Sequence, residues 1–409
     1  MTHIISDILR HKIADNILLL QGPVGYFFSD LHGHLKQCGA KNIIKINFNA
    51  GDDFYYKHQP TIKYNKPFHQ LEAFYTQIIK SRNIDAVYLF GDCRFIHHIA
   101  INVFKKHHIP YYVFEEGYIR PNYITMEQGG VNGNSSLKIT SIGKVPDFEC
   151  HKYQAILGRN PSKNAPMGYG SFRKMVLWGF IYFCMCRLKR YQYPFYIHHK
   201  SVSPFEIALW ILSFMRKYCY RIPDFKKQNF ILSNLSKRYF VVPLQVYNDA
   251  QIFNHSPFHD VTDFIETVLE SFANHAPKGI YLVIKHHPLD RGHRHYKQFI
   301  KNRSKQLGIK KRVIYVHEVS LPKILRHAKG VITINSTVGL SALHHQTPVK
   351  VLGNAFYDTG GLTYQGSLAR FWKQPGKVIE SNFVKYRKYI IIKSQILGSF
   401  YSKIFNIKV

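Results

Sequence analysis

The chain has 409 residues, enough for two domains of ordinary size that each bury their own core. Its 56 Lys and Arg outnumber its 24 Asp and Glu, and the formal charge of +32 predicts an anionic partner: nucleic acid, anionic lipid or an acidic sugar nucleotide. The six cysteines show no paired C-x-x-C spacing, which excludes a small disulfide scaffold and favours reduced cytosolic thiols. Residues 1–10 lack the basic start and continuous apolar core of an export signal, so we expect none.

Short apolar strands alternate with amphipathic helical stretches over the first 125 residues. This β-α-β order predicts a parallel, doubly wound sheet. We therefore assign residues 1–150 to a first Rossmann-like domain. The strands are predicted at residues 17–20, 43–46, 86–90 and 111–114.

The alternation breaks over residues 151–235, which we interpret as a helical connector. An apolar run at residues 175–186 makes a helix of only about 18 Å, too short for a hydrocarbon core of about 30 Å. A second helix is predicted to begin at the capping box that starts with Ser203. Between them, cations and aromatic residues are interleaved, which favours a helical pair lying on an anionic membrane surface; burial of both helices inside the protein is the alternative. The interleaved residues are Arg187, Lys189, Arg190, Tyr191, Tyr193, Phe195, Tyr196 and Lys200.

Strand and helix alternation returns at residue 239. Asp260 is predicted to cap a helix, because apolar residues recur behind it at helical spacing. We assign residues 236–375 to a second Rossmann-like domain and residues 376–409 to a tail that packs back across the domains. Two such domains facing a central cleft, with an α-helical connector, form a GT-B-like α/β architecture, which serves glycosyltransferases, epimerases and phosphorylases. The second set of strands is predicted at residues 239–242, 280–284, 313–316, 331–334 and 349–352.

Two adjacent carboxylates, Glu115 and Glu116, follow a predicted strand of the first domain. Ligands of open parallel sheets bind beyond the carboxyl ends of the strands, so residues at these positions are the first candidates for function. Repulsion between the two groups in a cleft would raise the pKa of at least one of them, as a general acid or base requires. A solvated acidic turn is the alternative.

Three further strand ends carry candidate residues in the second domain. Pro288 is expected to hold His287 extended beside Lys285, an arrangement suited to a phosphate, although a chance surface His-His pair is the alternative. Asn335, Ser336 and Thr337 precede a predicted helix and form either an anion site or an ordinary helix cap. Asp249 is a candidate nucleophile for a sugar anomeric carbon, or a loop acid.

In chain order, the acidic pair with Gly117, the His287-Pro288 pair and Ser336-Thr337 resemble the D/E-D/E-G, HP and S-S/T motifs of bacterial sialyltransferases and Kdo transferases. Both groups use CMP-activated 2-keto sugar acids. Residues 21–28, 45–52 and 114–121 further resemble the KpsS/LipB family of capsule polysaccharide proteins, a likeness that covers most of the chain and is weakest from 150 to 230. It implies a β-Kdo transferase that moves Kdo from CMP-Kdo to (lyso)phosphatidylglycerol with retention and starts the poly-Kdo linker.

The resemblance also implies roles for residues. Glu115 or Glu116 matches the acid/base, and Asp249 matches the nucleophile of retaining β-Kdo transferases. Since the first domain of a GT-B enzyme usually handles the acceptor, polar residues after its strands are assigned there, with turn chemistry as the alternative. The donor-binding residues are Lys285, His287, Pro288, Asn335, Ser336 and Thr337, and the acceptor-binding residues are Gly22, Asn47, Asn49, Asp52, Asp92 and Arg120.

The expected partners are CMP-Kdo, a (lyso)phosphatidylglycerol-like anionic lipid, the inner-membrane surface, a second Kdo transferase and the capsule export complex. No D-x-D-like aspartate pair is present, so neither a metal nor another cofactor is expected. The expected location is cytoplasmic and peripheral on the inner membrane of a Gram-negative bacterium. Three alternatives stay open: another CMP-sugar transferase such as a sialyltransferase, a non-catalytic capsule export accessory, and a nucleic-acid binder, for which no motif is recognised.

Overall fold

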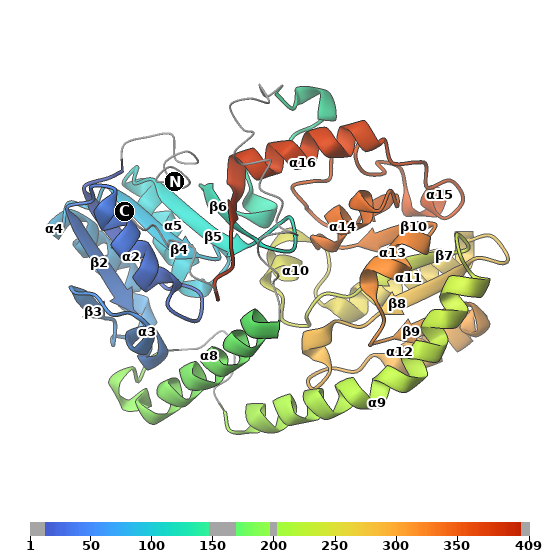
Figure 1. The fold of residues 1–409 in the computed structure, drawn as a ribbon, viewed down its shortest axis with the longest axis horizontal. Coiled ribbons are helices and arrows are strands. Elements are labelled where there is room, and N and C mark those ends of the chain that lie inside the picture. Colours follow the sequence, from blue (N-terminus) through green and yellow to red (C-terminus); the bar gives the residue numbers. More distant parts are fainter. Residues whose placement is uncertain (1–12, 147–168, 197–202, 402–409) are drawn as a thin grey trace. The chain divides into compact units, whose positions relative to one another are not determined.

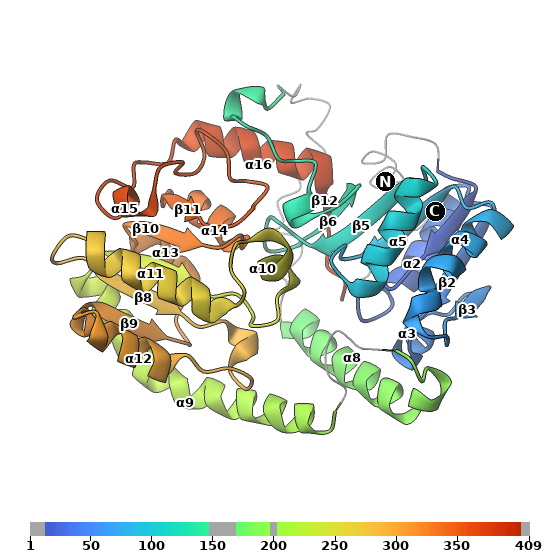
Figure 2. The same ribbon diagram turned by 180° about the vertical axis from the view of Figure 1, so that it is seen from behind.

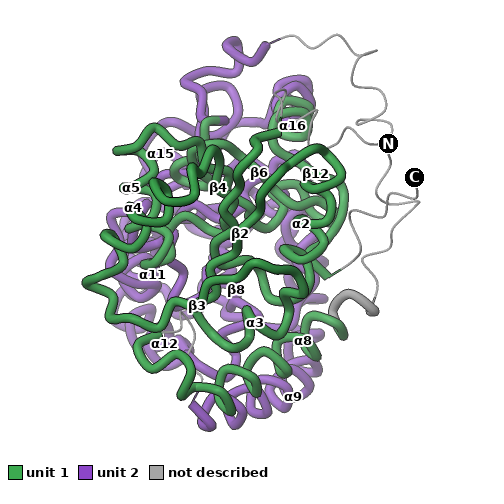
Figure 3. The backbone as a smooth tube through the Cα atoms, turned by 90° about the vertical axis from the view of Figure 1, so that its left-hand side faces the viewer, with its two compact units in different colours: residues 1–136, 148–202, 388–409 green, residues 137–147, 203–387 purple. Residues whose placement is uncertain are grey.

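A computed structural model describes residues 13–146, 169–196 and 203–401, so the N-terminal segment of residues 1–10 and Lys200 lie outside the described residues. The chain divides into two compact units, shown in different colours in Figure 3. Each unit has its own α/β sheet (Figure 1), and the two predicted doubly wound units are confirmed. Unit 1 comprises residues 1–136, 148–202 and 388–409, and unit 2 comprises residues 137–147 and 203–387.

Unit 1 is built on a seven-stranded sheet of order β12-β6-β5-β4-β1-β2-β3. Strands β1 to β5 pair in parallel, whereas β6 and β12 are antiparallel to their neighbours. The chain winds outward from β1 first to β2 and β3 and then, on the other side, to β4 and β5, which makes the sheet doubly wound. The strands are β1 (Asn16–Leu19), β2 (Asn42–Asn47), β3 (Thr61–Lys63), β4 (Ala86–Phe90), β5 (Tyr111–Glu116), β6 (Tyr123–Gln128) and β12 (Gln395–Leu397), and the helices include α2 (Phe27–Gln37), α3 (Ala50–Tyr55), α4 (Leu71–Ser81) and α5 (Phe95–Lys106).

Unit 2 has a five-stranded parallel sheet of order β11-β10-β7-β8-β9. Asp260 caps α11 as predicted, since its Oδ1 accepts from the backbone N–H groups of Thr262 (2.6 Å) and Asp263 (2.9 Å). The apolar residues behind this cap are buried in the core of the unit. The strands are β7 (Tyr239–Pro243), β8 (Tyr281–Lys285), β9 (Val313–Val316), β10 (Gly330–Thr333) and β11 (Val349–Val351), with helices α10 (Ala250–His255), α11 (Val261–His275), α12 (Lys297–Gln306), α13 (Leu321–His327), α14 (Val338–His344) and α15 (Leu368–Phe371) (Figure 2).

The units differ from the predicted domain boundaries in two places. Residues 137–147 join unit 2, because Thr359 Oγ1 donates to the Ile139 carbonyl (2.9 Å) and Ile142 N–H donates to the Gly360 carbonyl (3.1 Å). The predicted tail contains α16 (Glu380–Ser394) and β12, which adds to unit 1 beside β6 with Ile396 opposite Ile124. Both contacts join segments far apart in the sequence, which local patterns do not reveal.

The predicted helical connector also divides between the units. Its first helix, α8 (Tyr169–Leu188), packs on α3 in unit 1, whereas the second, α9 (Phe205–Asn234), belongs to unit 2 and is much longer than the predicted segment. Within the described ranges, none of the helices combines the length and the apolarity that crossing a bilayer requires.

Candidate functional site

The strand order of unit 1 reverses between β1 and β4, and ligands of open α/β sheets bind at such a point, beyond the carboxyl ends of the strands. Gln21 and Gly22 follow β1 there, and Arg94 follows β4. Arg94 Nη1 donates to Gln21 Oε1 (2.7 Å) and approaches the Gly22 carbonyl (3.5 Å). One guanidinium thus joins the two strand ends at the switch point.

Gln21 connects Arg94 to a buried carboxylate. Its Nε2 donates to Asp52 Oδ2 (3.1 Å) and to the hydroxyl of Tyr196 (2.8 Å). Asn49 Nδ2 also donates to Asp52 Oδ2 (3.1 Å), and the Tyr182 hydroxyl contacts Asp52 Oδ1 (3.3 Å). Burial raises the pKa of Asp52, and the charge of Lys45 and the hydrogen bond from Gln21 oppose that rise. Gln21, Arg94, Tyr182 and Tyr196 were not among the predicted site residues.

Two of these partners come from the segment predicted to contact the membrane. Tyr196 turns toward Gln21, and Tyr193 is buried with its hydroxyl donating to Asp53 Oδ2 (2.6 Å). Tyr191 and Phe195 are instead exposed. Within this run, aromatic side chains that point into unit 1 therefore alternate with aromatic side chains that point away from it.

The other predicted acceptor residues after β2 are bonded to one another. Asn49 caps α3 by accepting from Asp52 N–H (2.9 Å), and Asn47 Nδ2 donates to Asp53 Oδ1 (2.6 Å). The ammonium of Lys45 in turn donates to Asn47 Oδ1. These bonds fix the loop that presents Asp52.

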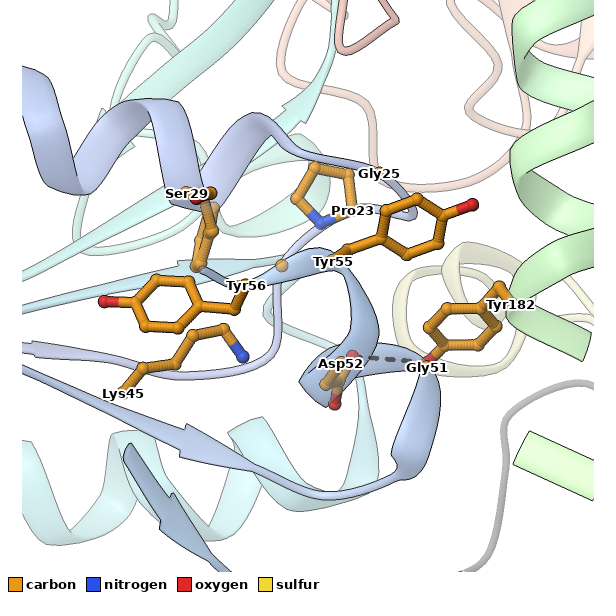
Figure 4. A pocket seen from close by; sticks show the side chains of 11 residues that line it. Pro23, Gly25, Ser29, Lys45, Gly51, Asp52, Tyr55, Tyr56 and Tyr182 are labelled. Atoms are coloured by element: carbon orange, nitrogen blue, oxygen red, sulfur yellow. Dashed lines mark hydrogen bonds between the residues drawn. The ribbon is translucent and has the colours of Figure 1, made fainter. Parts of the chain in front are cut away.

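A pocket opens beside this network (Figure 4). Lys45 reaches it from β2, and among the described residues no carboxylate lies within 4 Å of its ammonium. Burial lowers the pKa of Lys45, and Asp52 and Asp53 partly offset that effect. The pocket is small and places a cation, a carboxyl group and aromatic rings around one space. Its lining residues are Gly22, Pro23, Gly25, Phe28, Ser29, Lys45, Gly51, Asp52, Tyr55, Tyr56 and Tyr182.

Helix α8 reaches the pocket because glycine lies beneath its aromatic side chains. A Cβ on Gly51 would lie 2.3 Å from the ring of Tyr182, and one on Gly25 would lie 2.4 Å from the ring of Trp178. We expect Gly51→Ala to displace Tyr182 from Asp52 and to lower the free energy of unfolding by about 1–3 kcal/mol, as overpacking does. Urea denaturation measures this change.

Gly33→Ala is the matched control, because Gly33 also lies in a helix of unit 1 but no atom lies within 4 Å of its Cβ position in the described structure. The control should be neutral or gain up to about 1 kcal/mol from the better helix former. Equal stability of the two variants would contradict the close contact between Gly51 and Tyr182.

Glu115 and Glu116 end β5, and the alternation of a strand points them to opposite faces of the sheet. Glu115 is half-buried, whereas Glu116 is exposed. Burial raises the pKa of Glu115 to about 7, and the charge of Glu116 adds to that rise. The backbone N–H of Glu116 donates to Glu115 Oε1 (2.9 Å) and orients the carboxyl group. Burial also raises the pKa of Glu116, although the charge of Arg120 opposes that rise. Glu115 is the better suited of the two to exchange protons near neutral pH, because its carboxyl group is the more buried, is oriented by this hydrogen bond and lies near Arg94.

Gly91 directly follows β4 and lies near the side chains of both Glu115 and Arg94. Its backbone has φ +70°, and a Cβ there would lie 3.8 Å from Arg94 Nε and 3.8 Å from Glu115 Oε2. Apart from its chain neighbours, these are the only described atoms within 4 Å of that point. The absence of a side chain at residue 91 therefore leaves the space beside Glu115 and Arg94 uncrowded, and a side chain there would contact both.

The predicted acceptor residues Asp92 and Arg120 form hydrogen bonds to other partners than the members of the Gln21 network. Asp92 is buried, and its Oδ2 accepts from Val131 N–H (3.0 Å) and Asn134 Nδ2 (3.0 Å), which ties the loop after β6 to the end of β4. Arg120 is exposed in the β5–β6 connection and donates to the Gly117 carbonyl (3.3 Å).

The strand order of unit 2 reverses between β7 and β10, and the residues that follow these strands meet there. Gln245, after β7, donates through Nε2 to Asn335 Oδ1 (2.9 Å) after β10 and to Asp249 Oδ2 (3.0 Å). Asp249 caps α10, since its Oδ1 accepts from Gln251 N–H (2.9 Å). The predicted nucleophile and the first residue of the predicted anion site are therefore joined by Gln245, which sequence reasoning missed.

The two residues after Asn335 lie at the start of α14. Ser336 Oγ accepts from Val338 N–H (3.2 Å), as an ordinary cap would, whereas the Thr337 side chain caps no N–H of the helix. Both side chains are half-buried. The hydroxyl group of Thr337 is thus not used by the helix itself.

Lys285 is the last residue of β8, and His287 follows the strand. The backbone of His287 is extended (φ −74°, ψ 132°), as the following Pro288 predicts. Its Nδ1 accepts from Leu289 N–H (3.2 Å), so in the neutral ring the proton is on Nε2, which can donate to an acceptor such as a phosphate oxygen. Burial lowers the pKa of Lys285 to about 8, although the charge of Glu318 opposes the decrease.

Residues 85–401 match the family model described as capsule polysaccharide biosynthesis protein. This match places the chain, with its two α/β units, in the capsule polysaccharide class. The chain belongs to this family, which confirms the resemblance seen in its motifs. It is 41% identical over 387 residues to the capsule polysaccharide export protein KpsS of Escherichia coli, covering 94% of this chain and 96% of that protein. It is 40% identical over 399 residues to the capsule polysaccharide modification protein LipB of Neisseria meningitidis serogroup A, covering 96% and 93%.

Among solved structures, Thermosulfurimonas dismutans KpsC, titled a beta Kdo 2,7 transferase, is similar with a TM-score of 0.40 and 15% identity, covering 91% of this chain and 89% of that chain.

Proposed function

We propose that this protein transfers Kdo from CMP-Kdo to (lyso)phosphatidylglycerol and so starts the poly-Kdo linker of a capsule. Membership of the capsule polysaccharide family supports the pathway, and the motif resemblance supports the donor and the acceptor. The observation that carries the proposal is Glu115, a half-buried carboxyl group with a pKa of about 7 beside Arg94 at the switch point of unit 1. Such a group can take a proton from an acceptor hydroxyl near neutral pH.

The proposed reaction has two displacements. In the first, an oxygen of the Asp249 carboxylate forms a bond to the anomeric carbon of Kdo, and the bond from that carbon to the phosphate oxygen breaks, so CMP leaves with the electron pair. In the second, the acceptor hydroxyl attacks the same carbon while Glu115 takes its proton, and the ester to Asp249 breaks. Two inversions give net retention. Gln245 and Gln251 orient the Asp249 carboxylate, and each oxygen keeps a second lone pair.

The donor phosphate is assigned to the strand ends of unit 2. His287 would donate from Nε2, and Lys285 would regain a higher pKa beside the phosphate charge, which strengthens its hold on the departing CMP. Pro288 fixes the backbone of His287. Asn335, Ser336 and Thr337 follow β10, which β7 separates from β8 in the sheet. No metal or other cofactor takes part in this proposal.

The acceptor is assigned to unit 1. Gly22 and Asp52 line its pocket, and Asn47 and Asn49 fix the loop that presents Asp52. Asp92 orders the adjoining loop, and exposed Arg120 is available to an anionic headgroup. The protein would work at the cytoplasmic face of the inner membrane, with a second Kdo transferase and the capsule export complex as partners, and without nucleic acid.

The donor test uses purified protein with (lyso)phosphatidylglycerol and either CMP-Kdo or CMP-sialic acid, and measures CMP release. We expect acceptor-dependent release from CMP-Kdo alone, and a much slower rate for His287→Ala. Release from CMP-sialic acid alone would favour a sialyltransferase. Release from neither donor would favour an accessory role, which agrees with the word "export" in the name of the Escherichia coli relative.

A further inference from the structure

Helix α9 packs against unit 2 through polar side chains. Asp224 is buried and accepts from the backbone N–H groups of His317 (2.6 Å) and Glu318 (2.8 Å). Four residues earlier, Tyr220 stacks on the His317 ring at 4.0 Å, and four residues before that, Arg216 donates to the Arg291 carbonyl (2.6 Å). Residues four apart share one face of a helix, so this polar face is the inner one.

The opposite face of α9 is apolar and exposed. Its residues recur every three or four positions, which places them in one stripe along the helix. A surface helix of a globular protein usually has the reverse arrangement, and a contiguous exposed apolar patch marks an interaction site. Figures 1 and 2 show α9 along the edge of unit 2. The apolar stripe consists of Ile211 (56% exposed), Phe214 (62%), Met215 (58%), Tyr218 (52%), Ile222 (73%) and Phe225 (60%).

Cations border the apolar stripe. Arg221 and Lys226 are exposed on the outer half of α9, and Lys217 is exposed at the border between its two faces. The acids of α9 face inward, where Glu206 pairs with His293 (3.0 Å) and Asp224 caps the backbone of unit 2. The outer surface is therefore apolar in the middle and basic at its borders, which is the composition of helices that lie in anionic membrane interfaces.

We propose that the apolar stripe of α9 inserts into the headgroup region of an anionic bilayer, with the helix axis in the membrane plane. A second copy of the chain fits this surface less well, because a twofold contact would bring the same three cations of both copies together. The inference goes beyond the proposed reaction and does not depend on it, since it uses α9 alone. It makes the membrane contact predicted for the connector of residues 151–235 more specific, because it assigns the contact to one face of α9.

The test is co-sedimentation of the full-length protein with vesicles of phosphatidylglycerol and phosphatidylcholine. We expect the double variant Phe214→Ser/Ile222→Ser to bind these vesicles on the order of tenfold more weakly, while wild-type binding falls as salt is raised. Ile379→Ser is the matched control, because Ile379 is 55% exposed outside α9, and it should bind like wild type. Light scattering after gel filtration should give the same mass for all three proteins.

Wild-type vesicle binding by the double variant would overturn the proposal. So would a wild-type dimer that the double variant converts to a monomer, because the occupant of the stripe would then be a second copy. Transfer to a detergent-solubilised acceptor separates this proposal from the reaction: we expect the double variant to keep that activity. If the wild-type protein binds vesicles but transfers no Kdo, the result contradicts the proposed reaction and leaves the membrane proposal standing.

Discussion

Replacing Glu115 by glutamine is expected to lower kcat for Kdo transfer by about 10²–10⁴-fold, the contribution typical of a general acid or base. Glutamine keeps the size of the side chain but cannot take the acceptor proton. Glu116→Gln should stay within a few fold of wild type, because Glu116 is exposed and points to the other face of β5. Initial rates of acceptor glycosylation measure both variants.

The same assignment predicts the pH dependence. A base must be deprotonated, and burial raises the pKa of Glu115 from its ordinary value to about 7. The rate should therefore be low in mild acid, rise through pH of about 7 and level off above it. The Glu116→Gln variant should keep this rise in rate with pH, and the Glu115→Gln variant should lose it. A rate that falls as pH rises through this range would contradict the role of Glu115 as a base.

Gly91→Ala is expected to lower kcat/KM for the acceptor by about 10²-fold, because its methyl group would lie 3.8 Å from both Glu115 Oε2 and Arg94 Nε and would displace an acceptor hydroxyl bound beside them. Donor binding should be unchanged, because the residues assigned to the donor lie in unit 2. Steady-state kinetics with each substrate varied in turn separates the two effects.

Backbone strain at positive φ is a competing cause, and the chain offers a matched control. Gly308 has the same φ of +70°, but no described atom lies within 4 Å of its Cβ position. Gly308→Ala should therefore show a similar loss of stability with normal acceptor kinetics. An equal loss of kcat/KM in both variants would mean that backbone strain, and not contact of the methyl group with Glu115 and Arg94, explains the Gly91→Ala result.

The sheets were predictable from sequence because their central strands are short, uninterrupted apolar runs. The predicted strands at residues 17–20 and 239–242 correspond to β1 and β7. Each of these strands lies beside the point where the strand order of its sheet reverses. β12 was missed because it pairs with β6, some 270 residues away, and carries no pattern of its own. The extent of α9 was missed because Pro223 lies within it, and a proline inside a helical pattern normally predicts an end or a kink.

The candidate site was predictable only in outline. Position after a strand identified Glu115 and Glu116, but only strand alternation together with burial separates them. Gln21 was read only as part of the segment that resembles the family and Arg94 carried no motif, so neither was assigned to the site, although both lie shortly after strands at the switch point of unit 1. Tyr196 belongs to an aromatic and cationic run whose composition does not reveal which side chains turn inward.

The most direct test of the proposed reaction is the mass of a fluorescent lyso-phosphatidylglycerol analogue after incubation with CMP-Kdo and the wild-type, Glu115→Gln or Glu116→Gln protein. We predict that the acceptor gains one Kdo with wild type and with Glu116→Gln but not with Glu115→Gln. An unchanged acceptor with all three proteins, or an equal gain with Glu115→Gln, would contradict a transferase that uses Glu115 as its base.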